Sequence, residues 1–99
     1  MGNTGAFHWE KVNGRWWAFG AEGYLSTGWI YDTLYQGWFY MDENQGMLTG
    51  WQFINGKWYY LSKTSGAVPL GSMYREIRTP DGYYVDKDGA WDGLEAKEK

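Results

Sequence analysis

Short aromatic blocks alternate with polar turns along this chain. Residues 50–61 read Gly-Trp-Gln-Phe-Ile-Asn-Gly-Lys-Trp-Tyr-Tyr-Leu, so that one block stands on each side of Asn55-Gly56. An Asn-Gly pair favours positive φ at both positions, which a two-residue type I′ hairpin turn requires. Asn13-Gly14 interrupts an earlier block in the same way. The pattern predicts a tight antiparallel hairpin at both places.

The turns also predict the register of the strands. A third hairpin, between the other two, has a longer turn, which leaves the pairing of its strands unchanged. The predicted cross-strand pairs are Trp51 with Tyr60, Phe53 with Trp58, Trp29 with Tyr40, and Tyr31 with Trp38. Because side chains alternate between the two faces of a strand, the rings of each hairpin lie on one face. Each hairpin is therefore expected to carry an aromatic face.

The blocks form an internal repeat. Thr27-Gly28-Trp29 recurs as Thr49-Gly50-Trp51, and a turn and an aromatic cluster follow each copy. The clusters are Trp16-Trp17-Ala18-Phe19, Trp38-Phe39-Tyr40-Met41, Trp58-Tyr59-Tyr60-Leu61 and, more weakly, Gly82-Tyr83-Tyr84-Val85. A lone two-stranded hairpin is marginally stable in water, so the copies must stack to bury their faces. The sequence predicts an all-β fold, a β-hairpin solenoid of about four repeats of about 20 residues.

The predicted repeat domain covers residues 9–92, with repeats at about 9–28, 29–50, 51–71 and 72–92. Residues 1–8 are expected to be disordered or introduced for expression, and residues 93–99 form a charged C-terminal tail. The face opposite the aromatic plates is assigned to the core. Its members are Trp17, Phe19, Met41, Tyr59, Leu61 and Val85.

Aromatic residues also occupy the predicted gaps between neighbouring copies. Each gap would combine the first ring of a hairpin, the first ring of its cluster and the third cluster position of the next copy. The predicted sets are Trp9, Trp16 and Tyr40; Trp29, Trp38 and Tyr60; and Trp51, Trp58 and Tyr84. Corresponding positions that would face beyond the ends, such as Ala18 and Gly82, are not aromatic. Three rings around one hollow suit a quaternary ammonium group, which aromatic faces attract.

Composition excludes several classes of function. A net charge of −3 and a pI near 5.0 lack the surplus of Lys and Arg that binding to nucleic acid requires. The absence of Cys excludes disulfides and thiolate metal sites. No apolar run is long enough to span a membrane. Because His8 is the single histidine and no catalytic constellation is visible, we expect neither an enzyme, nor a metal site, nor a cofactor.

At residues 28–50 and 50–68 the chain resembles the choline-binding, or cell-wall-binding, repeats of Gram-positive surface proteins. The shared pattern is Gly-Trp, a turn with Gly, Trp-Tyr-Tyr-Leu, a polar turn, and a small-then-apolar pair after a glycine. The match is looser at 9–28 and partial at 73–91. The resemblance implies a left-handed β-solenoid with choline sites between successive hairpins, each walled by the apolar residue after the glycine. The implied walls are Leu25, Leu48 and Val68.

The resemblance further implies a non-catalytic module that binds choline on teichoic acids at the outer surface of a cell. Related repeats in glucan-binding enzymes hold sugars, so a glucan or another glycan is the alternative ligand, and a structural spacer is a third interpretation. A monomer is expected, although exposed hairpin edges leave a dimer open. The fourth copy lacks the Gly-Trp start, and Arg75 or Arg78 near the third gap would repel a cation.

Overall fold

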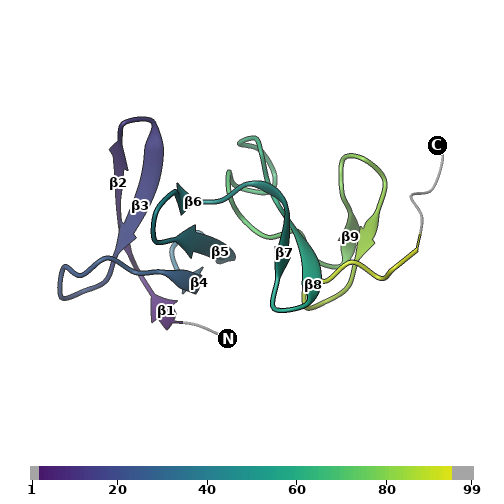
Figure 1. The fold of residues 1–99 in the computed structure, drawn as a ribbon, viewed down its shortest axis with the longest axis horizontal. Coiled ribbons are helices and arrows are strands. Elements are labelled where there is room, and N and C mark those ends of the chain that lie inside the picture. Colours follow the sequence, from purple (N-terminus) through teal and green to yellow (C-terminus); the bar gives the residue numbers. More distant parts are fainter. Residues whose placement is uncertain (1–2, 95–99) are drawn as a thin grey trace. The chain divides into compact units, whose positions relative to one another are not determined.

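In the computed structural model of the protein, residues 3–94 are described, and all of their regular structure is β-strand. The chain divides into two compact units, Met1–Leu48 and Thr49–Lys99. Figure 1 shows the strands of each unit. None of the described residues forms a helix long and apolar enough to cross a membrane. Most of the predicted charged tail, residues 95–99, lies outside the described residues.

Unit 1 contains two sheets. Its strands are β1 (Asn3–Gly5), β2 (His8–Val12), β3 (Arg15–Phe19), β4 (Gly28–Asp32), β5 (Gly37–Asp42) and β6 (Gly46–Met47). β2 and β3 form an antiparallel hairpin, and the other sheet has the order β1-β4-β5-β6 (Figure 1). β4 and β5 are its central hairpin, in which Trp29 pairs with Tyr40 and Tyr31 with Trp38, as predicted.

Unit 2 also contains two hairpins. Its strands are β7 (Gly50–Ile54), β8 (Lys57–Leu61), β9 (Ile77–Arg78) and β10 (Tyr84–Val85). In the β7–β8 hairpin Trp51 pairs with Tyr60 and Phe53 with Trp58, which confirms the predicted register. The β9–β10 hairpin is short, and Tyr84 lies opposite Arg78.

The two tight turns have the predicted backbone. Asn13 and Gly14 have φ of 53° and 80°, and Asn55 and Gly56 have φ of 51° and 85°. Positive φ at both central residues is the condition for a type I′ turn, whose twist matches that of the flanking strands. These turns therefore set the register in which the rings face one another across each hairpin.

A short return segment follows the second strand of every hairpin. One residue of the segment, which we call the return residue, pairs with the last residue of the aromatic cluster. The four pairs are Leu25 with Phe19, Met47 with Met41, Met73 with Leu61, and Trp91 with Val85. The next residue donates its backbone N–H to the third cluster position in each copy, at 2.8–3.2 Å between nitrogen and oxygen. Each repeat is thus a hairpin with a brief third strand.

The third repeat extends beyond its predicted end near residue 71. Met73 pairs with Leu61, and the N–H of Tyr74 donates to the carbonyl oxygen of Tyr60, so both residues belong to the third repeat rather than to a fourth that begins near 72. The cause is the loop after β8, in which Ser62 exchanges backbone hydrogen bonds with Gly71 and Ser72. The positive φ that closes this loop is at Gly71, 83°.

Of residues 1–8, predicted to be disordered or introduced for expression, residues 1–2 lie outside the described residues, whereas the segment from residue 3 contains a paired strand and is not disordered. β1 pairs in parallel with β4, with Asn3 opposite Ile30 and Gly5 opposite Asp32. Phe7 packs against the core of unit 1. Backbone pairing along the outer edge of β4 and burial of one aromatic ring hold this segment in place.

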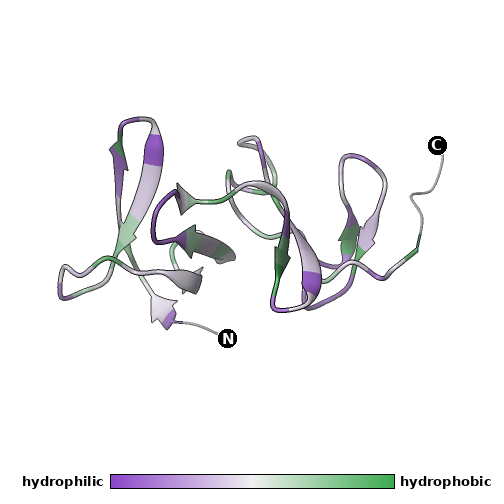
Figure 2. Ribbon diagram, viewed as in Figure 1, coloured by the Kyte–Doolittle hydropathy of each residue, from purple (hydrophilic) through white to green (hydrophobic). Residues whose placement is uncertain are grey.

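Each unit has a small core of mixed aliphatic and aromatic residues. In unit 1 the core consists of Ala18, Ile30, Phe39 and Met41. In unit 2 the buried residues include Leu61, Val85, Tyr59, Met73 and Ala90. Of the residues assigned to the core, Met41, Tyr59, Leu61 and Val85 are buried, while Trp17 and Phe19 are half-buried. Figure 2 shows hydrophilic residues gathered in turns, as between β5 and β6.

Candidate functional site

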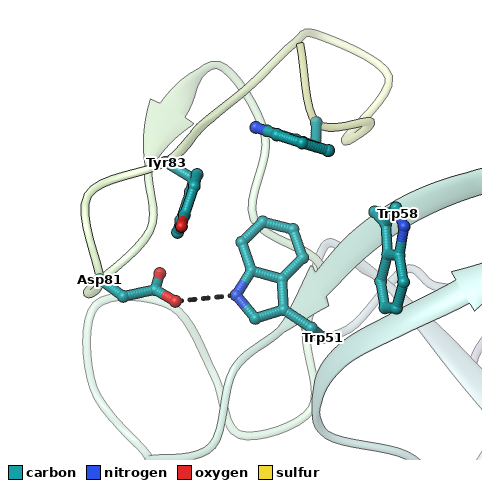
Figure 3. Close-up of a pocket in the computed structure, with 5 residues that line it drawn as sticks. Trp51, Trp58, Asp81 and Tyr83 are labelled. Carbon is teal, nitrogen blue, oxygen red and sulfur yellow. Dashed lines mark hydrogen bonds between the residues drawn. The ribbon is translucent and has the colours of Figure 1, made fainter. Parts of the chain in front are cut away.

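An aromatic pocket of about 370 Å³ lies in unit 2. Its lining consists of Trp51, Trp58, Asp81, Tyr83 and Trp91. Figure 3 shows the rings of Trp51, Trp58 and Tyr83 around the hollow, with the carboxylate of Asp81 beside the indole nitrogen of Trp51. Among residues 3–94 no group of three His, Asp or Glu side chains is placed to hold a metal ion. The pocket therefore offers aromatic faces and one carboxylate to a ligand.

The β7–β8 hairpin positions two of the rings. Trp51 and Trp58 share one face of the hairpin because of the register, and Trp51 packs edge-on against Tyr60 with ring centres 5.2 Å apart. Phe53 supports Trp58 from 5.2 Å. Trp58 nevertheless keeps 42% of its surface exposed, so a face of the indole is available to a ligand.

The last hairpin and its return segment position the other two rings. Tyr83 stands perpendicular to both Trp51 and Trp91, with ring centres 5.7 Å and 5.9 Å away. Trp91 is held at both ends: its backbone N–H donates to the carbonyl oxygen of Trp58 at 2.9 Å, and its indole N–H donates to the carbonyl oxygen of Leu94 at 2.8 Å. Perpendicular neighbours of this kind form the walls of a box rather than a stack.

Asp81 supplies a negative charge to this box. Its carboxylate accepts a hydrogen bond from the indole N–H of Trp51 at 2.9 Å and another from the hydroxyl of Thr79. Partial burial raises the pKa of Asp81, but the hydrogen bonds from Thr79, Trp51 and its own backbone, together with nearby Lys63, lower it by more, so that the pKa lies below its ordinary value of 3.8. The carboxylate is therefore ionised at neutral pH.

Unit 1 repeats part of this arrangement. The indole N–H of Trp9 donates to the carboxylate of Asp32 at 2.7 Å, and the ring of Trp9 packs edge-on against Phe39 at 5.1 Å. Trp9 and Trp51 both begin a hairpin, and Phe39 and Tyr83 both hold the second cluster position of the following hairpin. The same contact between successive hairpins, an indole on an aspartate and on an aromatic ring, thus occurs in both units.

The ring that meets the first tryptophan is therefore one position earlier in the cluster than the sequence analysis expects. Tyr40 was expected beside Trp9, but it packs against Trp29 of its own hairpin at 5.2 Å. Tyr84 was expected beside Trp51, but its ring lies 6.0 Å from the guanidinium of Arg78. Because neighbouring residues of a strand point to opposite faces, the following hairpin turns its other face toward the first tryptophan.

The other predicted rings occupy defined places. Trp16 is half-buried on β3, and the ammonium of Lys11 lies 5.7 Å from its ring centre. Trp29 and Trp38 contact each other at 6.4 Å within unit 1, whereas Tyr60 belongs to unit 2, where it contacts Tyr74 at 5.2 Å. The site predicted from Trp29, Trp38 and Tyr60 stays a prediction.

Of the three residues that the resemblance implies as walls of the choline sites, Leu25, Leu48 and Val68, only Leu25 is a return residue. Leu25 is a return residue and remains 42% exposed, whereas Met47 and Met73 hold the positions expected for Leu48 and Val68. Leu48 follows its return residue, and Val68 lies half-buried inside the longer loop after β8. In the pocket of unit 2 the return residue is Trp91, which adds a ring where the other repeats have an aliphatic or thioether side chain.

Asp81, Tyr83 and Trp91 line the pocket but are absent from the predicted site. Two signals were available in the sequence. An aspartate stands shortly before the second and the fourth cluster, at Asp32 and Asp81, and a glycine stands shortly before each return residue. The spacing between the return residue and its glycine varies, however, and the aspartates resemble ordinary turn residues.

Comparison with known proteins identifies the class. The family model of the cell wall binding repeat matches residues 49–68. The choline-binding domain of Spr1274 from Streptococcus pneumoniae is 30% identical, with 84% of this chain and 90% of that chain covered and a TM-score of 0.68. Choline binding protein F from the same organism is 30% identical over 84% of this chain and 39% of that chain, with a TM-score of 0.51. No curated protein sequence matches the chain.

An enzyme also carries similar repeats. Truncated alternansucrase from Leuconostoc mesenteroides is 29% identical over 88% of this chain, with a TM-score of 0.65, but this chain spans only 7% of the enzyme's length. The chain belongs to the family of choline-binding, cell-wall-binding repeats. It is a cell-wall- or glycan-binding module, and its all-β fold of hairpin repeats is the predicted solenoid class.

Proposed function

We propose that this chain binds choline groups on teichoic acids and thereby attaches a protein to a bacterial cell wall. The observation that carries the proposal is the pocket of unit 2, in which four aromatic rings surround a hollow that also contains the ionised carboxylate of Asp81. A trimethylammonium group suits this lining because it combines a positive charge with an apolar surface. The rings attract the charge and cover the methyl groups, and the carboxylate adds a directed attraction.

The expected affinity for a single choline is low. Each ring face contributes about 0.5–2 kcal/mol, and after the losses of binding this corresponds to a dissociation constant on the order of 1 mM. A teichoic acid presents many choline groups on one polymer. If a second site acts with the pocket, avidity raises the apparent affinity without any new contact.

Titration with matched ligands tests the proposal. Choline chloride and its neutral carbon analogue, 3,3-dimethyl-1-butanol, have the same shape and differ in charge. We expect choline to change the tryptophan fluorescence at millimolar concentration and the neutral analogue to bind several-fold more weakly. Equal responses to both ligands would show that the pocket does not select a cation and would contradict the proposal.

A glycan is the second candidate, favoured by the similarity to alternansucrase, of which a complex with isomaltononaose is known. Tryptophan faces stack on sugar rings, and Asp81 and Tyr83 can hydrogen-bond to hydroxyl groups. Isomaltononaose is therefore the probe for this candidate. Saturable binding of the oligosaccharide that choline does not displace, together with no response to choline, would replace the proposed ligand by a glucan.

The proposed ligand also implies a location. Choline on teichoic acids is outside the cell membrane, so the module would act extracellularly at the cell surface. We propose no catalytic step for this chain, because the family to which it belongs is one of binding repeats.

A further inference from the structure

One position distinguishes the first hairpin from the next two. The residue opposite the first tryptophan of each cluster is Lys11 for Trp16, Tyr31 for Trp38 and Phe53 for Trp58. Tyr31 and Phe53 support their tryptophans with ring centres 5.2 Å apart. In the first hairpin the ammonium of Lys11 lies 5.7 Å from the centre of the Trp16 ring instead.

The ammonium of Lys11 is directed to this ring rather than to a carboxylate. Lys11 is exposed, and among residues 3–94 the structure shows no salt bridge to it, the side chain of Glu10 being hydrogen-bonded to His8. A cation within about 6 Å of an indole ring is attracted by the electrons of its face. Lys11 therefore makes with Trp16 the interaction that a ligand cation would make.

The surroundings of Trp16 match those of Trp58 in the pocket of unit 2. Trp9 shares the face of the first hairpin with Trp16, as Trp51 does with Trp58. The bond from Trp9 to Asp32 corresponds to that from Trp51 to Asp81. The two units thus present related aromatic faces, and in the first hairpin the ammonium of Lys11 lies against the tryptophan that corresponds to Trp58.

We infer that Lys11 is a specificity-determining residue that weakens binding of quaternary ammonium ligands at Trp16, so that the two units bind choline unequally. The inference rests on the proposed function. Lys11 acts in two ways: its ammonium competes for the face of Trp16, and its charge repels a second cation. An exposed cation–π contact corresponds to about a two- to fivefold change in a binding constant, which is the size of the expected difference.

Fluorine NMR of the full chain labelled with 5-fluorotryptophan tests the inference, because each of the 8 tryptophans gives a separate signal. Choline chloride is titrated, and the signals of Trp16 and Trp58 are followed separately after assignment by single Trp→Phe substitutions. Lys11→Met removes the charge and keeps the apolar stem, whereas Lys11→Arg keeps the charge. Lys57→Met removes one charge from the β7–β8 hairpin and is the matched control.

We expect Lys11→Met to lower the choline concentration at the midpoint of the Trp16 response by about two- to fivefold. Lys11→Arg and Lys57→Met should leave that midpoint unchanged. The inference is wrong if Lys11→Met has the wild-type midpoint or no Trp16 response while Trp58 responds to choline. It is equally wrong if Lys57→Met has the same effect on Trp16 as Lys11→Met. If neither Trp16 nor Trp58 responds to choline in any variant, the proposed function fails and the inference fails with it.

Discussion

Replacing Asp81 by Asn separates the charge of the pocket from its shape. The oxygen of Asn can still accept the hydrogen bond from the indole of Trp51, and its amide can donate to the hydroxyl oxygen of Thr79. The rings should therefore keep their places, and only the negative charge is lost. The substitution tests whether the pocket selects a cation by a carboxylate.

The expected loss of choline binding energy in Asp81→Asn follows from the exposure of Asp81. Two unit charges about 4 Å apart attract each other by about 1 kcal/mol in a water-like medium, and this is the appropriate limit because Asp81 lies at the surface. A loss of about 1 kcal/mol corresponds to about a fivefold weaker binding of choline. The difference between wild type and Asp81→Asn should shrink as salt is raised from about 0.1 M toward 1 M, because screening then removes the charge term.

Isothermal titration calorimetry with choline and with 3,3-dimethyl-1-butanol measures the effect. Asp81→Asn should weaken the binding of choline about fivefold and leave that of the neutral alcohol unchanged. A loss of affinity for both ligands would mean that the substitution has damaged the pocket. An unchanged affinity for choline would refute the view that the carboxylate takes part in recognition.

The pKa of Asp81 adds a dependence on pH. Because the folded-state pKa is lowered below 3.8, the carboxylate stays ionised throughout the neutral and mildly acidic range. The contribution of this ionised carboxylate to the stability of the folded state is present above its unfolded-state pKa and is lost as the pH falls through its folded-state pKa. Choline affinity should accordingly be constant from about pH 7 to pH 5 and should fall only below the ordinary pKa of a carboxyl group. In Asp81→Asn the loss of choline affinity at acidic pH should be smaller than in the wild type.

Three further substitutions test the structure. Trp58→Ala should abolish the response to choline while thermal denaturation shows a loss of at most about 2 kcal/mol, because the ring is 42% exposed; an unchanged choline titration would remove Trp58 from the site. In urea denaturation, Gly46→Ala should destabilise unit 1 by at least about 1 kcal/mol more than Gly14→Ala. Both glycines have positive φ, but of the two only Gly46 has a carbonyl oxygen, at 2.5 Å, in the place of an added Cβ. Equal losses of stability in the two variants would contradict this packing. Asp32→Ala should cost about 2–4 kcal/mol in the same assay, because it leaves an indole N–H and two backbone N–H groups without their acceptor, and a cost below about 0.5 kcal/mol would be incompatible with these bonds.

The hairpins and their register could be predicted because local chemistry determines them. Asn55-Gly56 dictates a two-residue turn, and once the turn is known, the alternation of side chains places Trp51 opposite Tyr60. The same reasoning holds for the longer turn after Asp32, which this carboxylate closes by accepting from two backbone N–H groups. These features depend on residues close together in the chain.

The contacts between hairpins could not be predicted in the same way. Whether Tyr83 or Tyr84 meets Trp51 depends on which face the following hairpin turns toward it, and the alternation of side chains is equally compatible with both. The return residue of the third repeat is Met73 because the preceding loop is longer than in the other copies, and hydrogen bonds of Ser62 hold that loop. Which residues form the site therefore depends on how one hairpin packs on the next and on the length of the loop between them.

The parallel pairing of β1 with β4 determines how unit 1 would respond to a force that pulls on β1. β1 precedes the first hairpin in the chain but is bonded to the second. A tensile force applied at Asn3 runs along the strand, so the backbone bonds between β1 and β4 bear the load together rather than one after another. A pull on this end therefore reaches the second hairpin first and leaves the first hairpin outside the direct line of force.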